Sequence, residues 1–150
     1  KDAIRAIEAY RPTNNRSQLS RTERNTLIMD AYNATPSSMA AALENFALVE
    51  DSFKIALLGD MRELGADSLR EHRACVGRIQ EMLSKGSLQG AYIVGEEFGK
   101  ALEGLSDSRI RHFSSSEALA EYLGTNIISG ASILVKGSRG IQMEKVLGCL

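Results

Sequence analysis

Apolar and polar positions along the chain alternate between two periods, and the alternation repeats four or five times from Thr26 onward. Short continuous apolar runs are typical of buried strands, whereas apolar residues spaced three and four apart are typical of helices. The runs predict strands at residues 26–30, 53–58, 90–94, 110–113 and 131–135, and the helical spacing predicts helices at residues 36–48, 67–84, 96–103, 115–123 and 139–147. This order predicts an α/β fold, a Rossmann-like mostly parallel sheet with helices on both faces.

The first 25 residues follow a different pattern. Residues 2–10 carry apolar side chains on roughly one helical face, and Pro12 ends the run. We therefore expect a short lead helix followed by a linker. The chain begins with Lys1, inside this helical pattern, rather than with methionine, which suggests a domain of a longer polypeptide.

Composition narrows the class of protein. With 150 residues, 43% hydrophobic content and a net charge of -1, the chain is expected to be one soluble domain with no bulk attraction to nucleic acid or to a membrane surface. Cys75 and Cys149 are isolated, so neither a zinc site nor a disulfide framework is indicated. No apolar run reaches the roughly 18 residues that a membrane span needs. A cytoplasmic location is the simplest expectation.

Three polar loops follow three of the expected strands, and the first is Asp30 to Thr35. An acid at a strand end can accept hydrogen bonds from a ribose, and Asn33 and Thr35 precede a helix N-terminus, whose positive end favours an anion. The alternative is that Asn33, Thr35 and Pro36 only form the turn and cap the helix. The loop by itself leaves both interpretations open.

The second loop runs from Gly59 to Gly65 and contains Asp60 and Glu63. Its glycines allow close approach to a ligand, and its carboxylates suit an amine or a metal-bound nucleotide. Two carboxylates are too few to specify a metal site. An ordinary solvated loop is the alternative.

The third loop, Lys136 to Gly140, is expected to open the last helix. Its lysine and arginine, with glycines that expose backbone N–H groups, suit a phosphate or a carboxylate. The chain has no G-x-x-x-x-G-K-[ST] motif and no G-x-G, so the usual means of binding nucleotide phosphates are absent from the sequence. His72 is more readily a core-edge or interface histidine than a catalytic one.

Together, the segments DAYNATPSSMAAAL, LLGDMRELG with His72 after it, and ILVKGSRGIQMEKV resemble, in order and spacing, the C-terminal domain of Mur ligases. The nearest type adds D-alanyl-D-alanine to UDP-N-acetylmuramoyl tripeptide in peptidoglycan precursor synthesis. The segment Asn15-Arg16-Ser17-Gln18 resembles the arginine segment by which that family enters the domain. The resemblance implies residues 1–25 as the end of a central domain and its linker, and 26–150 as the C-terminal domain.

The resemblance implies an ATP-dependent amide ligation in which the tripeptide carboxylate becomes an acyl phosphate and the dipeptide amine attacks it. ATP and Mg²⁺ would be held mainly by a central domain, and the UDP-sugar by an N-terminal one. Neither of these two binding sites is in this sequence. Catalytic residues are therefore not expected in this domain alone, and it would be inactive by itself.

Site residues follow from the resemblance position by position. Arg16, Asp30 and Asn33 would contact the nucleotide, Asp30 through the ribose. The residues expected to line the substrate cleft are Thr35, Asp60, Glu63, Lys136, Ser138 and Arg139. The chemistry of a zwitterionic dipeptide fits this set, since Asp60 or Glu63 can pair with its ammonium and Lys136 with Arg139 can pair with its carboxylate. The chain departs from the family at Asn15, where glycine is common, and at Thr35, where asparagine is common.

Two alternatives remain at this stage. One is the C-terminal domain of another Mur-type or folylpolyglutamate-type ligase with a different amino substrate. The other is a non-catalytic α/β module that binds a small ligand or a protein partner.

Overall fold

Six strands form one mixed sheet in the computed structural model, which describes residues 18–30 and 34–150. The strands are β1 (Gln18–Arg21), β2 (Thr26–Asp30), β3 (Lys54–Gly59), β4 (Gly90–Val94), β5 (Ile110–Phe113) and β6 (Ser132–Lys136). Their order in the sheet is β1-β2-β6-β3-β4-β5. β1 is antiparallel to β2, and every other neighbouring pair is parallel. The predicted α/β fold with a mostly parallel sheet is confirmed.

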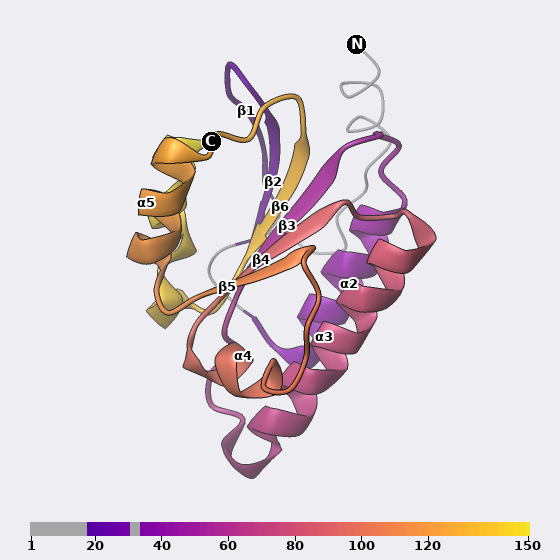
Figure 1. Ribbon diagram of the computed structural model, residues 1–150, viewed down its shortest axis with the longest axis vertical. Helices are drawn as coiled ribbons and strands as arrows, with labels where there is room; N and C mark the ends of the chain where they lie inside the picture. Colours follow the sequence, from indigo (N-terminus) through magenta and orange to yellow (C-terminus); the bar gives the residue numbers. More distant parts are fainter. Residues whose placement is uncertain (1–17, 31–33) are drawn as a thin grey trace.

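Helices cover both faces of the sheet (Figure 1). The α-helices are α2 (Pro36–Ala47), α3 (Ser68–Lys85), α4 (Glu96–Ala101) and α5 (Ser116–Thr125), and the 3₁₀ helices are η1 (Gly65–Asp67), η2 (Arg139–Ile141) and η3 (Met143–Cys149). α2, α3 and α4 share a core with one face, and α5 shares a core with η3 on the other. Within the described residues, no helix is long and apolar enough to cross a membrane.

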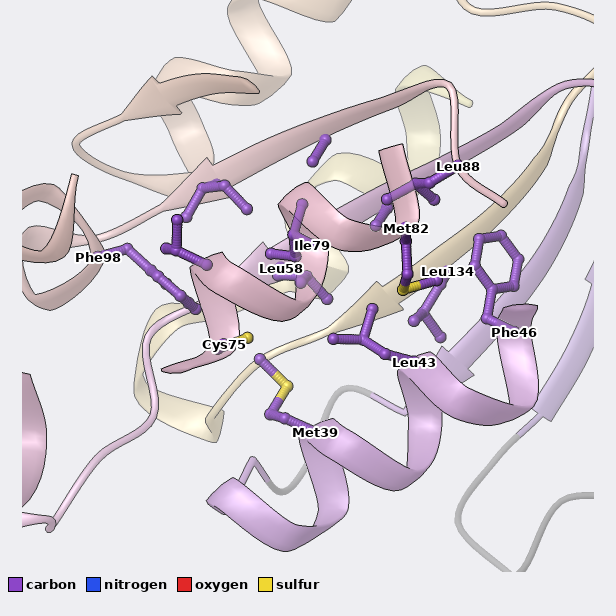
Figure 2. Packing of buried hydrophobic residues seen from close by; sticks show 14 of the residues in the cluster. Met39, Leu43, Phe46, Leu58, Cys75, Ile79, Met82, Leu88, Phe98 and Leu134 are labelled. Carbon is purple, nitrogen blue, oxygen red and sulfur yellow. The ribbon is translucent and has the colours of Figure 1, made fainter. Parts of the chain in front are cut away.

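The two cores explain why the strands read as continuous apolar runs. Successive residues of a strand point to opposite faces. Ile28 and Leu134 join the core under α2 and α3, whereas Leu27 and Ile133 join the core under α5 and η3. Figure 2 shows the first core, in which the labelled side chains of α2 and α3 meet over β3 and β6. Because both faces are buried, no polar alternation is left in the central strands.

The five expected strands are all present within one residue of their predicted bounds, but β1 was not expected. The sequence predicts a linker at residues 18–21, because QLSR has only one apolar residue and no strand period. β1 pairs with β2 along its length, from Gln18 opposite Met29 to Arg21 opposite Thr26. The division between residues 1–25 and 26–150 stays a prediction, and the lead helix at 2–10 lies outside the described residues.

The prediction of an α-helix at residues 139–147 was wrong. This segment forms η2 and η3, which are separated by Gln142 in the left-handed conformation (φ 59°, ψ 51°). A left-handed residue breaks the run of α-helical hydrogen bonds. The N–H groups of Ile141, Gln142 and Lys145 instead donate to carbonyls three residues back. In this conformation the segment after β6 packs against α5.

The sequence predicts a helix N-cap among Ser114 to Ser116 and helix C-caps at Gly86 and Gly124, and two of these three helix-end signals are confirmed. Ser115 caps α5 by accepting a hydrogen bond from the N–H of Ala118, and Gly86 ends α3. Gly124, expected as a cap, lies inside α5, which continues to Thr125.

Candidate functional site

The three polar loops begin on neighbouring strands. β2, β6 and β3 lie side by side in the sheet although they are far apart in the sequence. In the register, Asp30 is opposite Lys136, and Lys136 is opposite Leu58. The carboxyl ends of these strands therefore meet at one edge of the sheet, where open α/β sheets bind their ligands.

A cavity of about 640 Å³ opens at this edge. Its lining comes from residues 60–65 and 68 after β3, 95–97 after β4, 114–117 after β5 and 140–142 after β6. Five acidic side chains and one arginine are in this lining. A cavity of this volume accepts a small molecule, and its acidic lining favours a positively charged group.

Asp60 is the buried acid of this cavity lining. Its side chain is buried, with Oδ2 accepting from the N–H of Glu97 at 3.0 Å and Oδ1 accepting from the N–H of Phe98 at 2.9 Å. Burial raises the pKa of the Asp60 carboxyl, and the two N–H groups oppose that rise. Both oxygens thus already bind the start of α4.

Asp60 also binds two strand ends through its main chain. Its N–H donates to the carbonyl of Val94 at 3.0 Å, and its carbonyl accepts from the N–H of Ser138 at 3.2 Å. The residue therefore joins the loop after β3 to the ends of β4 and β6.

His72 lies directly behind this loop. It is fully buried, as a core histidine would be, and its Nε2 accepts from the N–H of Met61 at 3.0 Å. Its Nδ1 lies 2.7 Å from the carbonyl of Ser68 and, as the donor to that carbonyl, carries the proton. The ring also contacts Phe98 edge-on, with 4.7 Å between ring centroids. His72 thus supports the loop from inside the core and has no solvent-facing surface for catalysis.

Glu63 is the other acid that the sequence analysis expected to pair with an ammonium group, and its side chain is more exposed than that of Asp60. It lines the cavity, is exposed, and has a left-handed backbone with φ 63°. Such a conformation is uncommon for a residue with a side chain and requires support from its surroundings. Of the two acids, Glu63 is the one whose carboxylate can meet a ligand from solvent.

Another acid of the cavity, Glu97, already has a hydrogen-bond donor. The Ser68 hydroxyl donates to its carboxylate, and this bond holds the pKa of Glu97 below its ordinary value. Ser68 follows the loop on α3, so this contact joins α3 to the start of α4.

The three residues after β6 differ in exposure. The side chain of Lys136 is fully buried, Ser138 is 7% exposed and Arg139 is exposed. The hydroxyl of Ser138 has no hydrogen-bond partner among the described residues. Buried hydroxyl groups in proteins nearly always have a hydrogen-bond partner, so a ligand that supplies the partner is one explanation for the Ser138 hydroxyl. The cavity itself is lined by the next residues, Gly140 to Gln142.

Thr35 forms the N-cap of α2, which agrees with the alternative interpretation that this loop caps the helix. Its Oγ1 accepts from the N–H of Ser38 at 3.1 Å, and its own N–H donates to the hydroxyl of Ser38 at 2.9 Å. This reciprocal capping satisfies two backbone donors at the helix start. A substrate contact of Thr35 stays a prediction.

The cap gives a direct stability prediction. Thr35→Ala should lower the free energy of unfolding by about 1 kcal/mol, because the N–H of Ser38 loses its acceptor. Thr35→Ser keeps the hydroxyl and should stay within a few tenths of a kcal/mol of the parent chain. Urea unfolding of the three chains measures the difference. Equal stability of the alanine variant and the parent chain would mean that the cap does not stabilise α2.

The proposed nucleotide contacts are mostly outside the described part of the chain. Arg16 and Asn33 lie in residues 1–17 and 31–33, which the structure does not describe. Asp30 is the last residue of β2, next to Lys136 in the register. These three assignments stay predictions.

Two segments of the cavity lining, residues 95–97 and 114–117, were not predicted from the sequence. A usable signal was present, since both follow predicted strands and the carboxyl ends of all parallel strands share one edge of the sheet. Neither segment, however, carries a motif of the kind found in the three polar loops.

No group of three or more histidine, cysteine, aspartate or glutamate side chains among the described residues is placed to hold a metal ion.

Comparison with known proteins identifies the family. The family model described as "Mur ligase, glutamate ligase domain" matches residues 15–139. The chain belongs to the Mur ligase family. Mur ligases are ATP-dependent enzymes. The matched residues include the loop after β3 and Lys136 at the carboxyl end of β6.

Individual relatives point to one type within the family. The UDP-N-acetylmuramoyl-tripeptide--D-alanyl-D-alanine ligase of Treponema pallidum is 36% identical over 126 residues, which is 81% of this chain and 26% of that protein. The corresponding ligase of Bacillus subtilis is 31% identical over 153 residues, 97% of this chain and 32% of that protein. The MurF structure from Acinetobacter baumannii superposes with a TM-score of 0.75 at 28% identity, covering 97% of this chain and 31% of that one. The Mur ligase domain thus spans about a quarter to a third of the relatives it matches.

Proposed function

We propose that this chain is the C-terminal domain of a MurF-type ligase, which in full length joins D-alanyl-D-alanine to UDP-N-acetylmuramoyl tripeptide. The observation that carries the proposal is the match to MurF ligases over 81% to 97% of the chain. The cavity at the sheet edge supports it by offering room and charge for a small amine. Residues 1–25 would be the end of the central domain and its linker, and the enzyme would work in the cytoplasm.

In the proposed reaction, the tripeptide carboxylate takes the terminal phosphoryl group of ATP, so that an acyl phosphate forms and ADP is released. The dipeptide ammonium gives up a proton to solvent, the resulting amine attacks the acyl carbon and loses its second proton as the amide C–N bond forms, and the bond from that carbon to the phosphate oxygen breaks, which releases inorganic phosphate. ATP and Mg²⁺ would be held mainly by the central domain, and the UDP-sugar by the N-terminal one. Arg16, Asp30 and Asn33 would complete the nucleotide site when the domains close.

The part of this domain would be to hold the dipeptide in line with the acyl phosphate. Glu63, exposed in the acidic cavity, would pair with the ammonium. The positive charges of Lys136 and Arg139 suit the dipeptide carboxylate or the acyl phosphate. The Ser138 hydroxyl, buried and without a partner among the described residues, would donate to an oxygen of the same groups. Thr35, at the start of α2, would lie at the rim of this cleft.

The charge of the cavity argues against an amino substrate with an additional carboxylate. Five acids face one arginine there, so a second carboxylate on the incoming amine would meet like charge. D-alanyl-D-alanine has one carboxylate to place, whereas glutamate has two. This observation favours the MurF-type reaction over a glutamate-adding member of the family.

A ligation assay tests the proposed function. The full-length enzyme should form product and release phosphate with ATP, UDP-N-acetylmuramoyl tripeptide and D-alanyl-D-alanine. Glutamate and single D-alanine, offered in place of the dipeptide, should give at least about tenfold lower kcat/KM. Preference for any single amino acid over the dipeptide would rule out the MurF assignment.

A further inference from the structure

Asp60 lines the proposed amine site, but its carboxylate is buried and already accepts two hydrogen bonds from the protein. Both oxygens accept hydrogen bonds from the start of α4, at 2.9 and 3.0 Å, and the side chain is 3% exposed. A carboxylate with so little exposed surface offers an ammonium group that arrives from solvent almost nothing to contact. Direct binding of the amine by Asp60 is therefore unfavourable.

The loop that follows is held from a second side. The N–H of Met61 donates to Nε2 of His72, and the His72 ring is fixed by its bond to Ser68 and its contact with Phe98. Asp60 and Met61 are thus held by α4 and α3, the two helices that flank the cavity on this side.

The next residues along the chain are those that face the ligand. Arg62 and Glu63 both line the cavity, and Glu63 has the uncommon left-handed backbone. A side chain reached through such a turn keeps its direction only if the residues before it are fixed. The direction of Glu63 therefore depends on the bonds made by Asp60 and Met61.

We propose that Asp60, together with His72, is a positioning residue that fixes the loop after β3 so that Glu63 faces the incoming amine. The inference rests on the proposed function for the identity of the amine. It changes the expected part of Asp60, which acts through Glu63 and does not touch the substrate.

The test uses the full-length enzyme with ATP and D-alanyl-D-alanine. In Asp60→Asn the amide group turns a donor toward one of the two α4 N–H groups, so one bond is lost at nearly constant volume. The KM for the dipeptide should rise by about ten- to a hundredfold, while the KM for ATP should change by less than about twofold. Asp107→Asn is the matched control, because Asp107 also accepts a backbone N–H, from Arg109, but lies outside the cavity lining. It should leave both KM values unchanged.

A double-mutant cycle separates positioning from direct contact. If Asp60 acts through Glu63, then Asp60→Asn should add little to the KM effect of Glu63→Gln. If Asp60 itself binds the amine, the two effects should multiply, and that result would overturn the proposal.

Amide hydrogen exchange measures how firmly the loop after β3 is held, and it needs no assay of activity. In Asp60→Asn, faster exchange is expected for residues 61–65 and for the N–H groups of Glu97 and Phe98. In His72→Phe, faster exchange is expected for residues 61–65, because phenylalanine keeps an aromatic ring at this position but offers no acceptor to the N–H of Met61. His72→Gln offers an oxygen acceptor again and should restore part of the protection. Unchanged exchange in both Asp60→Asn and His72→Phe would refute the positioning role. If the wild-type enzyme does not use the dipeptide, the proposed function fails, and the exchange data still decide whether Asp60 and His72 hold the loop.

Discussion

Lys136→Met in the full-length enzyme should lower kcat/KM for ligation by about a hundredfold or more, the range seen when one charge-stabilising donor is removed from an active site. Lys136 ends the strand that lies between β2 and β3, so its position is at the centre of the sheet edge where the three loops meet. It is fully buried, and a buried charge acts more strongly on nearby charges than a charge in water does. At the edge where open α/β sheets bind their ligands, a buried positive charge suits the stabilisation of an anionic group.

Lys54 supplies the matched control, because it is the other buried lysine of the described strands. It begins β3, at the opposite end of the sheet, and its Nζ donates to the carbonyls of Phe46, Ala47 and Val49. Lys54→Met should therefore cost about 1.5–3 kcal/mol of stability and leave the ligation rate unchanged at 25 °C. Steady-state ligation and urea unfolding of both variants make the comparison. Wild-type turnover in Lys136→Met would remove Lys136 from the proposed site.

The sheet could be predicted from the sequence because its strands are buried on both faces. The run IALL before Gly59 and the run ILV before Lys136 are apolar at successive positions, and short apolar runs of this kind are typical of strands that lie between two helical layers. β1 could not be predicted in the same way, since its pairing with β2 depends on backbone hydrogen bonds that any sequence can make. Its one apolar residue, Leu19, is 47% exposed and contributes little burial.

The loops of the site could be predicted, but the contacts within them could not. Each loop was singled out because it is polar and follows a predicted strand, and the resemblance implied that Asp30, Asp60 and Lys136 belong to one site; the strands that carry them are neighbours in the sheet. The pairing of Asp60 with α4, in contrast, joins residues 37 and 38 positions apart, and no period or motif indicates it. The close approach of Gly95 to Asp60 could not be predicted either, because in the sequence Gly95 is only a glycine between a predicted strand and a predicted helix.

Gly95→Ala should be among the most destabilising single substitutions in this domain, at about 3–5 kcal/mol, from backbone strain and overpacking together. Gly95 has φ +118° and ψ 164°, a region of backbone space that is essentially restricted to glycine. A Cβ added there would lie well inside van der Waals contact distance of Cγ and both carboxylate oxygens of Asp60. The methyl group would therefore displace the carboxylate from the N–H groups of Glu97 and Phe98, and it would leave both donors buried without an acceptor.

Gly104→Ala separates the two causes, because Gly104 also has a positive φ, +79°, but among the described residues no atom beyond its two chain neighbours lies within 4 Å of the position that its added methyl group would occupy. It should cost only about 1–2 kcal/mol, the strain of a left-handed residue with a side chain. Urea unfolding of the two variants gives the difference directly. A cost for Gly95→Ala no larger than that for Gly104→Ala would show that Asp60 is not packed against Gly95, and the bonds from Asp60 to α4 would then lose their structural basis. A clear excess, in contrast, would measure how strongly the buried carboxylate is held between the loop after β3 and the start of α4.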